Sequence, residues 1–269
     1  MMNPFSKEYI PKPKNSTVGN HKINQLTRER FFSGDEPNLE FLIRERYEWM
    51  KNHIDKDKKI LELGSGAGLI KEVLKGFDII TSDVEKTPYI DTVIDATLIK
   101  EWIGEYDIII CSQMIHHLTS PINFLYNLNC MLKPGSLILI NESNPSFIHR
   151  CIMILFQHEG WSYNVNPFDS STSVKTGLKP MDGNNAVSRM IFDKPDKLLS
   201  ICPLLDIVED SFCESFLFII SGGVGKKTFT IQLPYLILKT ISLFDIMIST
   251  LFPSIFPLSR KIVIKKRLE

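Results

Sequence analysis

The sequence has few cysteines and no cysteine pattern typical of metal binding. Its 269 residues include 5 cysteines, scattered along the chain and never in a C-x-x-C pair. An odd, scattered set disfavours both a disulfide framework and a zinc knuckle. We therefore expect a chain of a reducing, cytoplasmic compartment, and we expect no metal site. The five are Cys111, Cys130, Cys151, Cys202 and Cys213.

The sequence also lacks net charge. Lys and Arg number 31, Asp and Glu number 31, and the formal net charge at pH 7 is +0. Without a net positive field, the chain has no general attraction for nucleic acid or another acidic polymer, so we expect no nucleic-acid partner. The composition, 43% hydrophobic and 23% charged, is that of a globular protein with a sizeable core.

Long uninterrupted apolar runs are missing as well. The first residues, MMNPFSKEYIPKPKNS, contain no apolar stretch of the kind that an export signal needs. Near the C-terminus, the apolar sequence is divided into runs shorter than the roughly 18 residues that a membrane-spanning helix requires. The dividing residues are Pro234, Lys239, Asp245 and Pro253. We expect neither an exported nor an integral membrane protein, and association with the inner face of the membrane stays open.

Three segments differ in composition. Residues 1–35 are polar, basic and proline-bearing, and we expect an extended or partly ordered arm there. Residues 36–145 begin with an amphipathic helix that starts at Glu36-Pro37 and ends near His53, and they continue into an α/β core. Residues 146–269 contain a polar insertion, apolar helices and the last strands, which complete the same domain.

Short apolar runs alternate with helical stretches in the core. We predict strands at 59–63, 77–81, 92–94, 106–111 and 136–140, and helices at 69–75, 121–132 and 147–156. This alternation predicts an α/β fold with a doubly wound, mainly parallel sheet. Such a sheet binds its ligand beyond the carboxyl ends of its strands, so we expect the chemistry at that edge.

A glycine-rich turn, ELGSGAG at 62–68, follows the first predicted strand. Its three alternate glycines allow a tight turn and close approach of the backbone to a ligand. The third glycine comes one residue earlier than in the dinucleotide pattern G-x-G-x-x-G, which argues against a nicotinamide dehydrogenase. The carboxylate of Glu62 would repel a pyrophosphate but suits a ligand that carries an ammonium group.

Acidic residues end the next two predicted strands. Asp83 is placed to accept two hydrogen bonds from ribose hydroxyls. Asp95 can accept a hydrogen bond from an exocyclic amine, and the backbone N–H of Ala96 can donate to a ring nitrogen. Together these groups predict a cradle for a nucleoside.

These motifs resemble the class I S-adenosylmethionine-dependent methyltransferases, particularly their type 11 group. ILELGSGAG (60–68) resembles the first motif, and YDIIICSQMIHH (106–117) and LKPGSLILI (132–140) resemble the fourth and fifth strands. The resemblance implies a Rossmann-like, doubly wound, seven-stranded sheet, mainly parallel with an antiparallel last strand, together with an N-terminal helical arm and a C-terminal helical insertion. It also implies S-adenosyl-L-methionine as the cofactor. The residues implied to bind it are Glu62, Gly64, Ser65, Gly66, Gly68, Asp83, Val84, Asp95, Ala96, Ser112 and Gln113.

The reaction of such an enzyme limits what a catalytic residue must do. Methyl transfer is an in-line displacement at an activated carbon, so a base is needed only when the nucleophile arrives protonated, as a hydroxyl does. His117, beyond the fourth strand, is a candidate because an imidazole with an ordinary pKa of about 6.5 can take a hydroxyl proton. At least one of His116 and His117 is expected only to cap or pack the next helix.

The segment after the fifth strand offers further candidates. QHEGWSYNVN (157–166) predicts a surface for a sugar or another polar substrate, on which aromatic side chains stack against rings and the carboxylate and amides bind hydroxyls. A plain polar connection is the alternative. His158 beside Glu159 is the preferred base and Glu142 is the second choice. A His158→Ala variant should lose turnover and keep its cofactor affinity. HEGWSYNV (158–165) and GNNAVS (183–188) also resemble methyltransferases of cell-surface polysaccharide biosynthesis.

The C-terminal region contains a false nucleotide motif and an apolar helix. SGGVGKKT (221–228) follows an apolar, strand-like run at 216–220, but its spacing does not match a phosphate-binding loop, so it predicts a turn. Residues 235–252 predict an apolar helix with a narrow polar stripe. We expect it to be buried; a lid, a dimer face and a membrane-interface helix are alternatives. Residues 260–267 predict the antiparallel last strand, with charges that protect a sheet edge.

We therefore expect a methyltransferase that acts at an oxygen of a small-molecule, sugar or lipid-linked glycan acceptor. A catalytically silent cofactor-binding module and a peripheral membrane protein are the alternatives. Residues 1–30 hold six basic and two acidic side chains, and residues 260–269 hold five basic and one acidic. Each end therefore has a net charge of +4, which leaves a net charge of −8 for residues 31–259. The acidic middle suits a cationic sulfonium, and the basic ends favour peripheral contact of residues 229–267 with an anionic membrane. A homodimer is also open.

Overall fold

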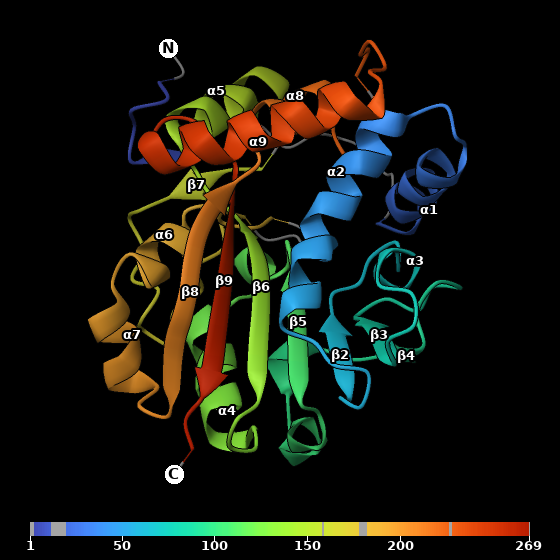
Figure 1. Cartoon of the computed structure of the whole chain (residues 1–269). Coiled ribbons are helices and arrows are strands. Elements are labelled where there is room, and N and C mark those ends of the chain that lie inside the picture. Colours follow the sequence, from blue (N-terminus) through green and yellow to red (C-terminus); the bar gives the residue numbers. More distant parts are fainter. Residues whose placement is uncertain (1–2, 12–19, 158, 178–181, 226–227, 269) are drawn as a thin grey trace.

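A seven-stranded sheet organises the computed structural model, which describes residues 3–11, 20–157, 159–177, 182–225 and 228–268 (Figure 1). The strand order is β4-β3-β2-β5-β6-β9-β8, and β9 is antiparallel to both of its neighbours while the other pairs are parallel. The expected mainly parallel sheet with an antiparallel last strand is confirmed. The strands are β2 (Ile60–Leu63), β3 (Ile79–Asp83), β4 (Thr92–Val93), β5 (Ile108–Ser112), β6 (Leu137–Ser143), β8 (Leu205–Cys213) and β9 (Ser259–Lys266).

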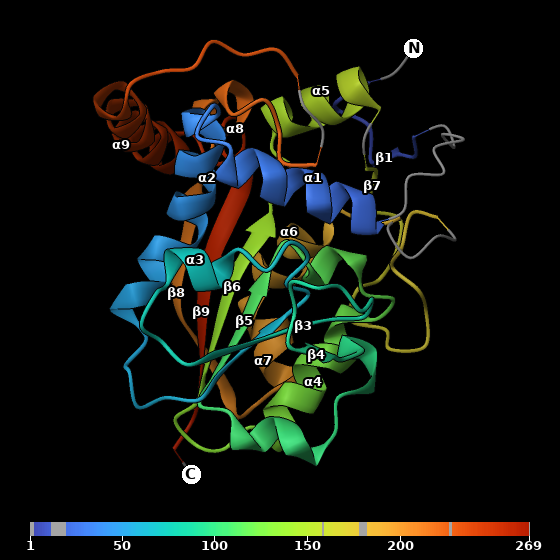
Figure 2. The same cartoon turned by 90° about the vertical axis from the view of Figure 1, so that its right-hand side faces the viewer.

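Helices cover both faces of the sheet (Figure 2). Successive side chains of a strand point to opposite faces, so each strand contributes to two cores. Leu61 and Ile109 belong to the core that includes α4, α6 and α7, whereas Ile60 and Ile108 belong to the core with α2 and α3. The helices are α1 (Asn20–Phe32), α2 (Pro37–Glu48), α3 (Ile70–Val73), α4 (Pro121–Met131), α5 (Phe147–Phe156), α6 (Val187–Phe192), α7 (Pro195–Ile201), α8 (Phe216–Ile220) and α9 (Tyr235–Leu251).

The N-terminal arm is only partly extended. Residues 8–9 form β1 (Glu8–Tyr9), which pairs with β7 (Trp161–Ser162) in a separate two-stranded sheet. Residues 20–32 form α1, so the extended alternative is wrong there, and the helix agrees with the N-terminal helical arm that the resemblance implies. This helix is held mainly by polar contacts: buried Arg30 donates hydrogen bonds to Glu36 at 2.7 and 2.9 Å and to the Val224 carbonyl at 3.0 Å. Polar contacts leave no apolar periodicity for a sequence pattern to reveal.

The apolar run at 216–220 forms the helix α8 and not a strand. The carboxylate of Asp245, on α9, accepts hydrogen bonds from the backbone amides of Ser215, Phe216 and Leu217, each at 2.9 Å. These amides have no partner within a helix that begins here, so Asp245 caps α8. This long-range contact decides between helix and strand for a five-residue run.

Strand β9 lies inside the sheet, so its charges do not protect an edge. Arg260 forms ion pairs with Asp210 and Asp193, and Arg267 forms one with Asp206. The β9 arrow in Figure 1 points away from α9, towards the C-terminus at the opposite end of the molecule. The expectation that the basic C-terminal residues flank the apolar helix is therefore wrong for Lys265, Lys266 and Arg267, whereas Lys261, near the start of β9, lines a cavity with Ser242 and Asp245 of α9.

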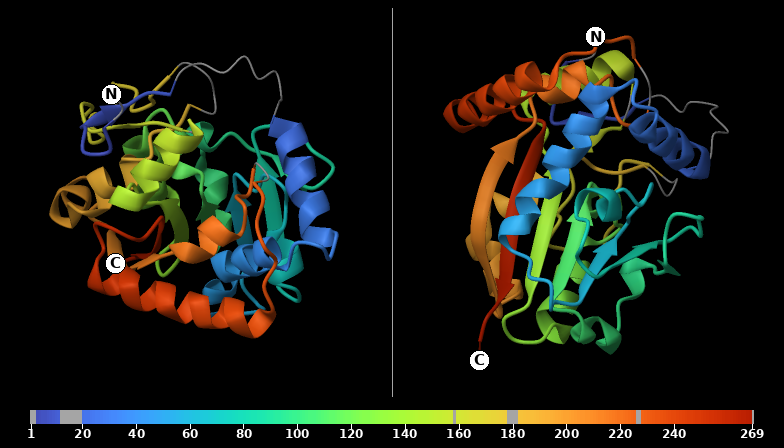
Figure 3. Two further views of the ribbon diagram at one scale, coloured as in Figure 1. Left: turned by 90° about the horizontal axis from the view of Figure 1, so that it is seen from above. Right: turned by 45° about the vertical axis from the view of Figure 1, so that its right-hand side comes forward.

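Helix α9 crosses the end of the sheet where the parallel strands terminate, and α5 and α8 lie at the same end (Figures 1 and 3). The expected burial of this helix is wrong for most of its length. Its buried side chains are Leu238, Ser242, Asp245, Ile248 and Ser249. Among the residues that the structure describes, no helix is both long and apolar enough to cross a bilayer.

Candidate active site

The glycine loop, residues 64–68, lies at the carboxyl end of β2 and is fastened to β3. Gly64, Gly66 and Gly68 have φ values of 71°, 52° and 62°, which other residues rarely adopt. The Ser65 amide donates a hydrogen bond to the Ser82 carbonyl at 2.8 Å, and the Ser82 amide donates to Ser65 Oγ at 3.0 Å. The loop therefore has one defined conformation at the expected edge of the sheet.

At two of these positions, neighbouring atoms also leave no room for a Cβ atom. A Cβ on Gly68 would lie 2.2 Å from the Tyr89 carbonyl oxygen, and a Cβ on Gly64 would lie 2.5 Å from Met114 Cγ. The second contact shows that the turn after β5, which carries the two histidines, packs directly against the glycine loop. The predicted cofactor residues and the predicted catalytic residues are thus adjacent.

Glu62, at the end of β2, has a fully buried carboxylate without a hydrogen-bond partner on either oxygen. The hydroxyls of Tyr47 and Ser65 are its polar neighbours, but neither makes a well-formed hydrogen bond with it. Burial, with a smaller contribution from Asp83, raises the pKa of Glu62 to about 7. A buried acid without a partner is costly unless a ligand supplies a donor. An ammonium group would supply such a donor, and this role of Glu62 stays a prediction.

The two predicted nucleoside-binding acids lie at the expected strand ends. Asp83 Oδ2 accepts a hydrogen bond from the Gly66 amide at 2.9 Å, so the carboxylate also orders the glycine loop. Asp95 Oδ1 accepts hydrogen bonds from the amide and hydroxyl of Thr97, at 2.8 and 2.6 Å. A carboxylate has about four acceptor positions, so both acids retain capacity for ribose or adenine. The exposed Val84 and the half-buried Ala96 adjoin them.

The residues at the end of β5 contribute differently from expectation. Ser112 ends the strand, and the hydroxyl of Tyr47 lies close to both Ser112 and Glu62. The side chain of Gln113 turns towards β6 and β9, where it donates hydrogen bonds to Asn141 Oδ1 at 2.8 Å and Ser259 Oγ at 3.2 Å. Gln113 therefore borders the cofactor region through its backbone, and Tyr47 is a neighbour that the sequence motifs did not reveal.

Helix α1 is a second feature that the sequence did not reveal at this site. Arg28 donates a hydrogen bond to the Ala67 carbonyl at 3.1 Å and lies 3.6 Å from Glu72. A Cβ on Gly66 would lie 3.2 Å from Asn24 Oδ1. In Figure 2, α1 lies over the segment that contains the glycine loop and α3. The N-terminal arm is thus part of the candidate cofactor site.

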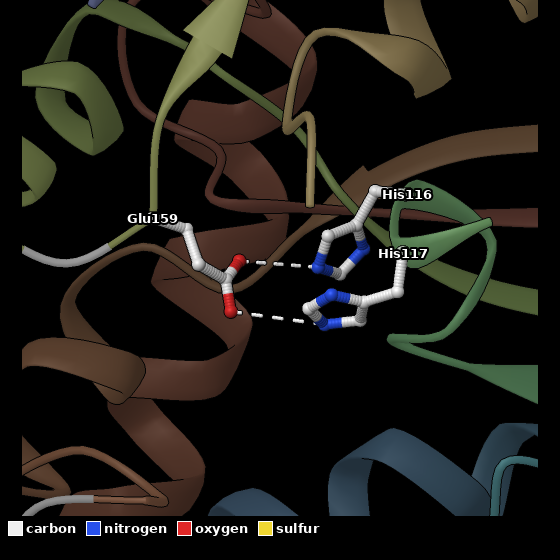
Figure 4. Close-up of side chains that lie close together, drawn as sticks. All are labelled: His116, His117 and Glu159. Atoms are coloured by element: carbon white, nitrogen blue, oxygen red, sulfur yellow. Dashed lines mark hydrogen bonds and ion pairs between the residues drawn. The ribbon is translucent and has the colours of Figure 1, made fainter. Parts of the chain in front are cut away.

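His116 is buried between two carboxylates, one of which is seen in Figure 4. Its Nδ1 donates a short hydrogen bond to Glu142 and its Nε2 donates one to Glu159 Oε2 at 3.1 Å. Burial alone would lower the pKa of His116, but the charges and hydrogen bonds of the two acids raise it to about 10. At neutral pH His116 is therefore an imidazolium that holds both carboxylates in place.

Glu142 occupies a different place from that expected of a base. Its carboxylate is fully buried and also accepts hydrogen bonds from the amides of Ile115 at 2.8 Å and Ser143 at 2.7 Å. Burial would raise the pKa of Glu142, but His116 and these donors hold it below its ordinary value. Glu142 therefore acts on the site through His116.

His117 lies beside its neighbour, with Nε2 at 3.7 Å from Glu159 Oε1 (Figure 4). Burial and the charge of His116 lower the pKa of His117 to about 4, so this imidazole is neutral at pH 7. A Cβ on Gly183 would lie 2.8 Å from His117 Nδ1, so the backbone there must approach closely. His158, the preferred base, lies outside the described residues.

The two polar stretches of the acceptor-side segment meet at this cluster. The Asn184 amide donates a hydrogen bond to the His116 carbonyl at 2.8 Å, and Asn185 Nδ2 donates to Glu159 Oε2 at 3.1 Å. Gly160 and Asn184 also form an isolated β-bridge. Both stretches had been singled out in the sequence, but their contact is a property of the fold.

The aromatic residues of this segment do not form the expected sugar-stacking surface. Trp161 is completely buried and packs on Tyr9 with ring centroids 5.0 Å apart. The hydroxyl of Tyr163 accepts a hydrogen bond from Arg150 at 3.0 Å. The prediction of an exposed aromatic platform is therefore wrong for Trp161, and the polar groups around Glu159 are what this segment contributes.

The cluster has the composition of a metal site. His116, His117 and Glu159 offer ligand atoms that lie within 4.8 Å of one another. A histidine binds a metal through a deprotonated nitrogen, and both nitrogens of His116 lie within hydrogen-bond distance of a carboxylate. A metal ion would have to displace a proton from a group whose pKa is about 10. The arrangement favours a hydrogen-bonded network, and the absence of a metal stays a prediction.

Comparison with known proteins decides the family. A family profile described as "Methyltransferase domain" matches residues 38–176, just over half of the chain. The chain belongs to this methyltransferase domain family. The family that the sequence motifs resemble is confirmed. The matched region runs from α2 through the sheet to the segment that carries Glu159.

Curated relatives match a shorter part of the chain. The chain is 24% identical over 118 residues to a ubiquinone biosynthesis O-methyltransferase of Azotobacter vinelandii, and the match covers 37% of this chain and 50% of the relative. It is 25% identical over 132 residues to the protein of that name from Burkholderia pseudomallei, covering 40% and 57%. The chain thus spans about half the length of these relatives.

A solved structure shows the same fold. The match to the SAM dependent methyltransferase from Archaeoglobus fulgidus covers 90% of this chain and 99% of that one, with a TM-score of 0.51 and 18% identity. The expected Rossmann-like methyltransferase fold is confirmed.

Proposed function

We propose that the chain transfers a methyl group from S-adenosyl-L-methionine to a hydroxyl oxygen of a small-molecule, sugar or lipid-linked glycan acceptor in the cytoplasm. One observation carries the proposal. A buried carboxylate without a partner, Glu62, lies beside a glycine loop that packs through Met114 against a neutral histidine paired with Glu159. The first group suits a cationic cofactor, and the second suits a protonated nucleophile.

The cofactor half is formed by residues of this chain in distinct roles. Glu62 would accept hydrogen bonds from the ammonium group, Asp83 from the ribose hydroxyls, and Asp95 from the adenine amine. The glycine loop gives the backbone access to the ligand, and α1 covers that loop through Arg28. When bound, the cofactor supplies a methyl group on a positively charged sulfur, which is already activated for displacement.

The half of the site that faces the acceptor removes the proton of the acceptor hydroxyl. The pair of His117 and Glu159 would take the hydroxyl proton when the acceptor oxygen receives the methyl group. His117 is unprotonated at neutral pH and can accept that proton, and the Glu159 carboxylate beside it would stabilise the imidazolium that forms. The His116 imidazolium and Asn185 fix Glu159 through hydrogen bonds, both at 3.1 Å, so the pair is positioned before the acceptor binds.

Oxygen is the acceptor atom that these observations favour. Sulfur and carbon nucleophiles lose their protons under different conditions from a hydroxyl. A hydroxyl needs a base of the kind found here to remove its proton. The names of the relatives from Azotobacter vinelandii and Burkholderia pseudomallei, ubiquinone biosynthesis O-methyltransferase, support the same choice. The resemblance of residues 158–165 and 183–188 to polysaccharide methyltransferases supports a sugar or lipid-linked glycan within this class.

The test is acceptor-dependent release of S-adenosylhomocysteine from the full chain, with cofactor binding measured separately by calorimetry. Hydroxylated small molecules, sugars and lipid-linked glycans form the acceptor panel. We expect release with one class and about a hundredfold or greater loss in His117→Gln, with cofactor affinity within about twofold of wild type. Asn164→Ala, at an exposed position, is the control. Cofactor binding without release for any acceptor would contradict the proposal.

A further inference from the structure

Helix α9 is inverted relative to an ordinary surface helix. A surface helix normally buries its apolar side and exposes its polar side. In α9, three of the five buried side chains are Ser242, Asp245 and Ser249. The opposite side presents seven large apolar residues that are 46–75% exposed. They are Leu236, Ile237, Leu243, Phe244, Ile246, Met247 and Leu251.

Hydrogen bonds fix this orientation. Asp245 caps α8, Ser242 donates a hydrogen bond to Glu45 at 2.7 Å, and the hydroxyls of Ser249 and Ser215 lie 3.1 Å apart. Rolling the helix to bury its apolar side would break all of these contacts and leave the Asp245 carboxylate without its three amide donors. The apolar side is therefore held outward by the fold itself.

The outward side of α9 has few polar groups that need hydrogen bonds from water. The hydroxyls of Thr240 and Thr250 donate hydrogen bonds to carbonyls one turn earlier in α9, Leu236 and Ile246, both at 2.9 Å. Lys239 is the charged residue exposed on this helix. Soluble monomers rarely expose a continuous apolar surface of this kind without a binding partner.

The apolar surface continues beyond α9. Phe216, at the start of α8, lies 6.1 Å from Phe244 and 6.2 Å from Phe256 between ring centroids, and Phe252 lies 5.9 Å from Phe256. These segments lie at the end of the molecule where the parallel strands terminate (Figures 1 and 3). We call the outward side of α9 together with Phe216 and residues 252–256 the apolar end face.

Among the described residues of the apolar end face, the exposed charged side chain is Lys239. Asp245, the acid of α9, is buried against α8 and does not reach the surface. Glu45 of α2 lies on the inward side of α9, where its carboxylate accepts the hydrogen bond of Ser242. An apolar helix face whose exposed charge is a lysine is complementary to an anionic bilayer.

We propose that the apolar end face binds the surface of an anionic lipid bilayer, with α9 lying in the plane of the interface. The 17-residue helix crosses the strands in Figure 1, so it can lie flat while the sheet stands away from the lipid. The carboxyl edge that carries the candidate active site then lies on the membrane side. This proposal does not depend on methyl transfer, because it rests on α9 and its neighbours alone.

Co-sedimentation with lipid vesicles tests the proposal. The full chain is mixed with vesicles of equal parts phosphatidylglycerol and phosphatidylcholine, or of phosphatidylcholine alone. We expect stronger binding to the anionic vesicles and a decrease with added salt. Leu243→Glu and Phe244→Glu should each weaken binding about tenfold or more, because each places a charge in the contacting surface.

The matched control is Leu268→Glu, an exposed leucine near the C-terminus at the opposite end of the molecule. It should bind vesicles like wild type. All three variants should keep the thermal midpoint and cofactor affinity of wild type, which separates a lost surface from a lost fold or a lost cofactor site. Absence of binding to anionic vesicles would overturn the proposal. So would a dimer, seen by light scattering, that Leu243→Glu converts to monomers while vesicle binding is unchanged.

Discussion

Glu62 and Glu142 are the same residue type, equally buried, at the ends of two strands of one sheet, yet their surroundings give them opposite properties. Glu62 has no hydrogen-bond partner and its pKa is raised to about 7. Glu142 is bonded to His116 and to backbone amides, and its pKa is lowered. Burial of a carboxylate therefore identifies neither a ligand site nor a structural ion pair; the donors around it decide.

The contrast divides the candidate active site into two halves. In the half around Glu62, the carboxylate has no hydrogen-bond partner unless a cationic ligand binds. In the unliganded chain this carboxylate therefore lowers the free energy of unfolding. The half around Glu142, His116 and Glu159 is complete, so its residues add stability and hold a fixed geometry. Replacing each carboxylate by its neutral amide changes charge with little change in shape, and such variants test whether the two halves differ in this way.

The largest effect is expected from Glu159→Gln. The variant removes the carboxylate that pairs with His117, so turnover should fall about a thousandfold, within the usual range for loss of general base catalysis. The measurement is S-adenosylhomocysteine release at saturating cofactor. Glu209→Gln, at an exposed carboxylate of β8, is the control and should be unaffected. A decrease of less than about tenfold for Glu159→Gln would show that the pair does not take the proton.

The next effect is a loss of stability in Glu142→Gln. This change leaves the buried His116 without its stronger partner, and breaking a buried ion pair from one side costs about 3 kcal/mol or more. Urea unfolding at pH 7 measures the difference. An unchanged free energy of unfolding would mean that Glu142 is not the partner that charges His116.

The same pair predicts a pH dependence of stability. The pKa of His116 is raised to about 10 in the folded chain, above its ordinary value of 6.5. Its contribution is therefore complete below about pH 6.5 and is lost as the pH rises through about 10. Wild-type stability should fall over this interval, and the slope should be smaller in Glu142→Gln.

Glu62→Gln should change the free energy of unfolding in the opposite direction from Glu142→Gln, by increasing it. The pKa of Glu62 is about 7 in the folded chain, above its ordinary 4.5, so the destabilisation grows from about pH 4.5 and is complete above about pH 7. At pH 8, without cofactor, the variant should be more stable than wild type by on the order of 2 kcal/mol. Thermal or urea unfolding measures it. A destabilised variant would show that Glu62 already has partners in the unliganded chain.

Cofactor affinity should also depend on pH through Glu62. Below about pH 7 the carboxyl is protonated and no longer attracts an ammonium group, so affinity should fall by up to about tenfold for each unit below that pH. Calorimetry in two buffers of different ionisation enthalpy should detect protons released on binding. Affinity that is constant between pH 6 and 8 would contradict this role.

The smallest effect is expected from metal removal. Dialysis against a chelator should leave turnover within about twofold, because both nitrogens of His116 are held as donors to carboxylates. A loss of turnover that a divalent metal restores would show instead that His116, His117 and Glu159 are metal ligands.

The core of the fold was predictable because its signals are local. The strands and the glycine loop follow from short apolar runs and from glycine spacing, and the structure places Asp83 and Asp95 at the strand ends as predicted. These features depend on residues near one another in sequence. The sequence also identified Glu62 as an acid suited to an ammonium group.

The errors have a common physical cause, which is dependence on distant contacts. Helix α1 is held by polar contacts of Arg28 and Arg30, which give no apolar periodicity. The run at 216–220 is a helix because Asp245 caps it from α9. Likewise, the polar stripe of α9 faces inward because its partners lie on α2 and α8, and the contact of Asn185 with Glu159 joins two loops.

The affinity for S-adenosyl-L-methionine of Glu62→Gln, compared by calorimetry at pH 8 with that of Glu159→Gln, tests the division of the site most directly. Both variants make the same chemical change at a carboxylate. The account predicts about a hundredfold weaker binding for Glu62→Gln, since a buried charged partner of the cofactor is lost, and binding within about twofold of wild type for Glu159→Gln. Equal losses in the two variants, or wild-type affinity in Glu62→Gln, would contradict it.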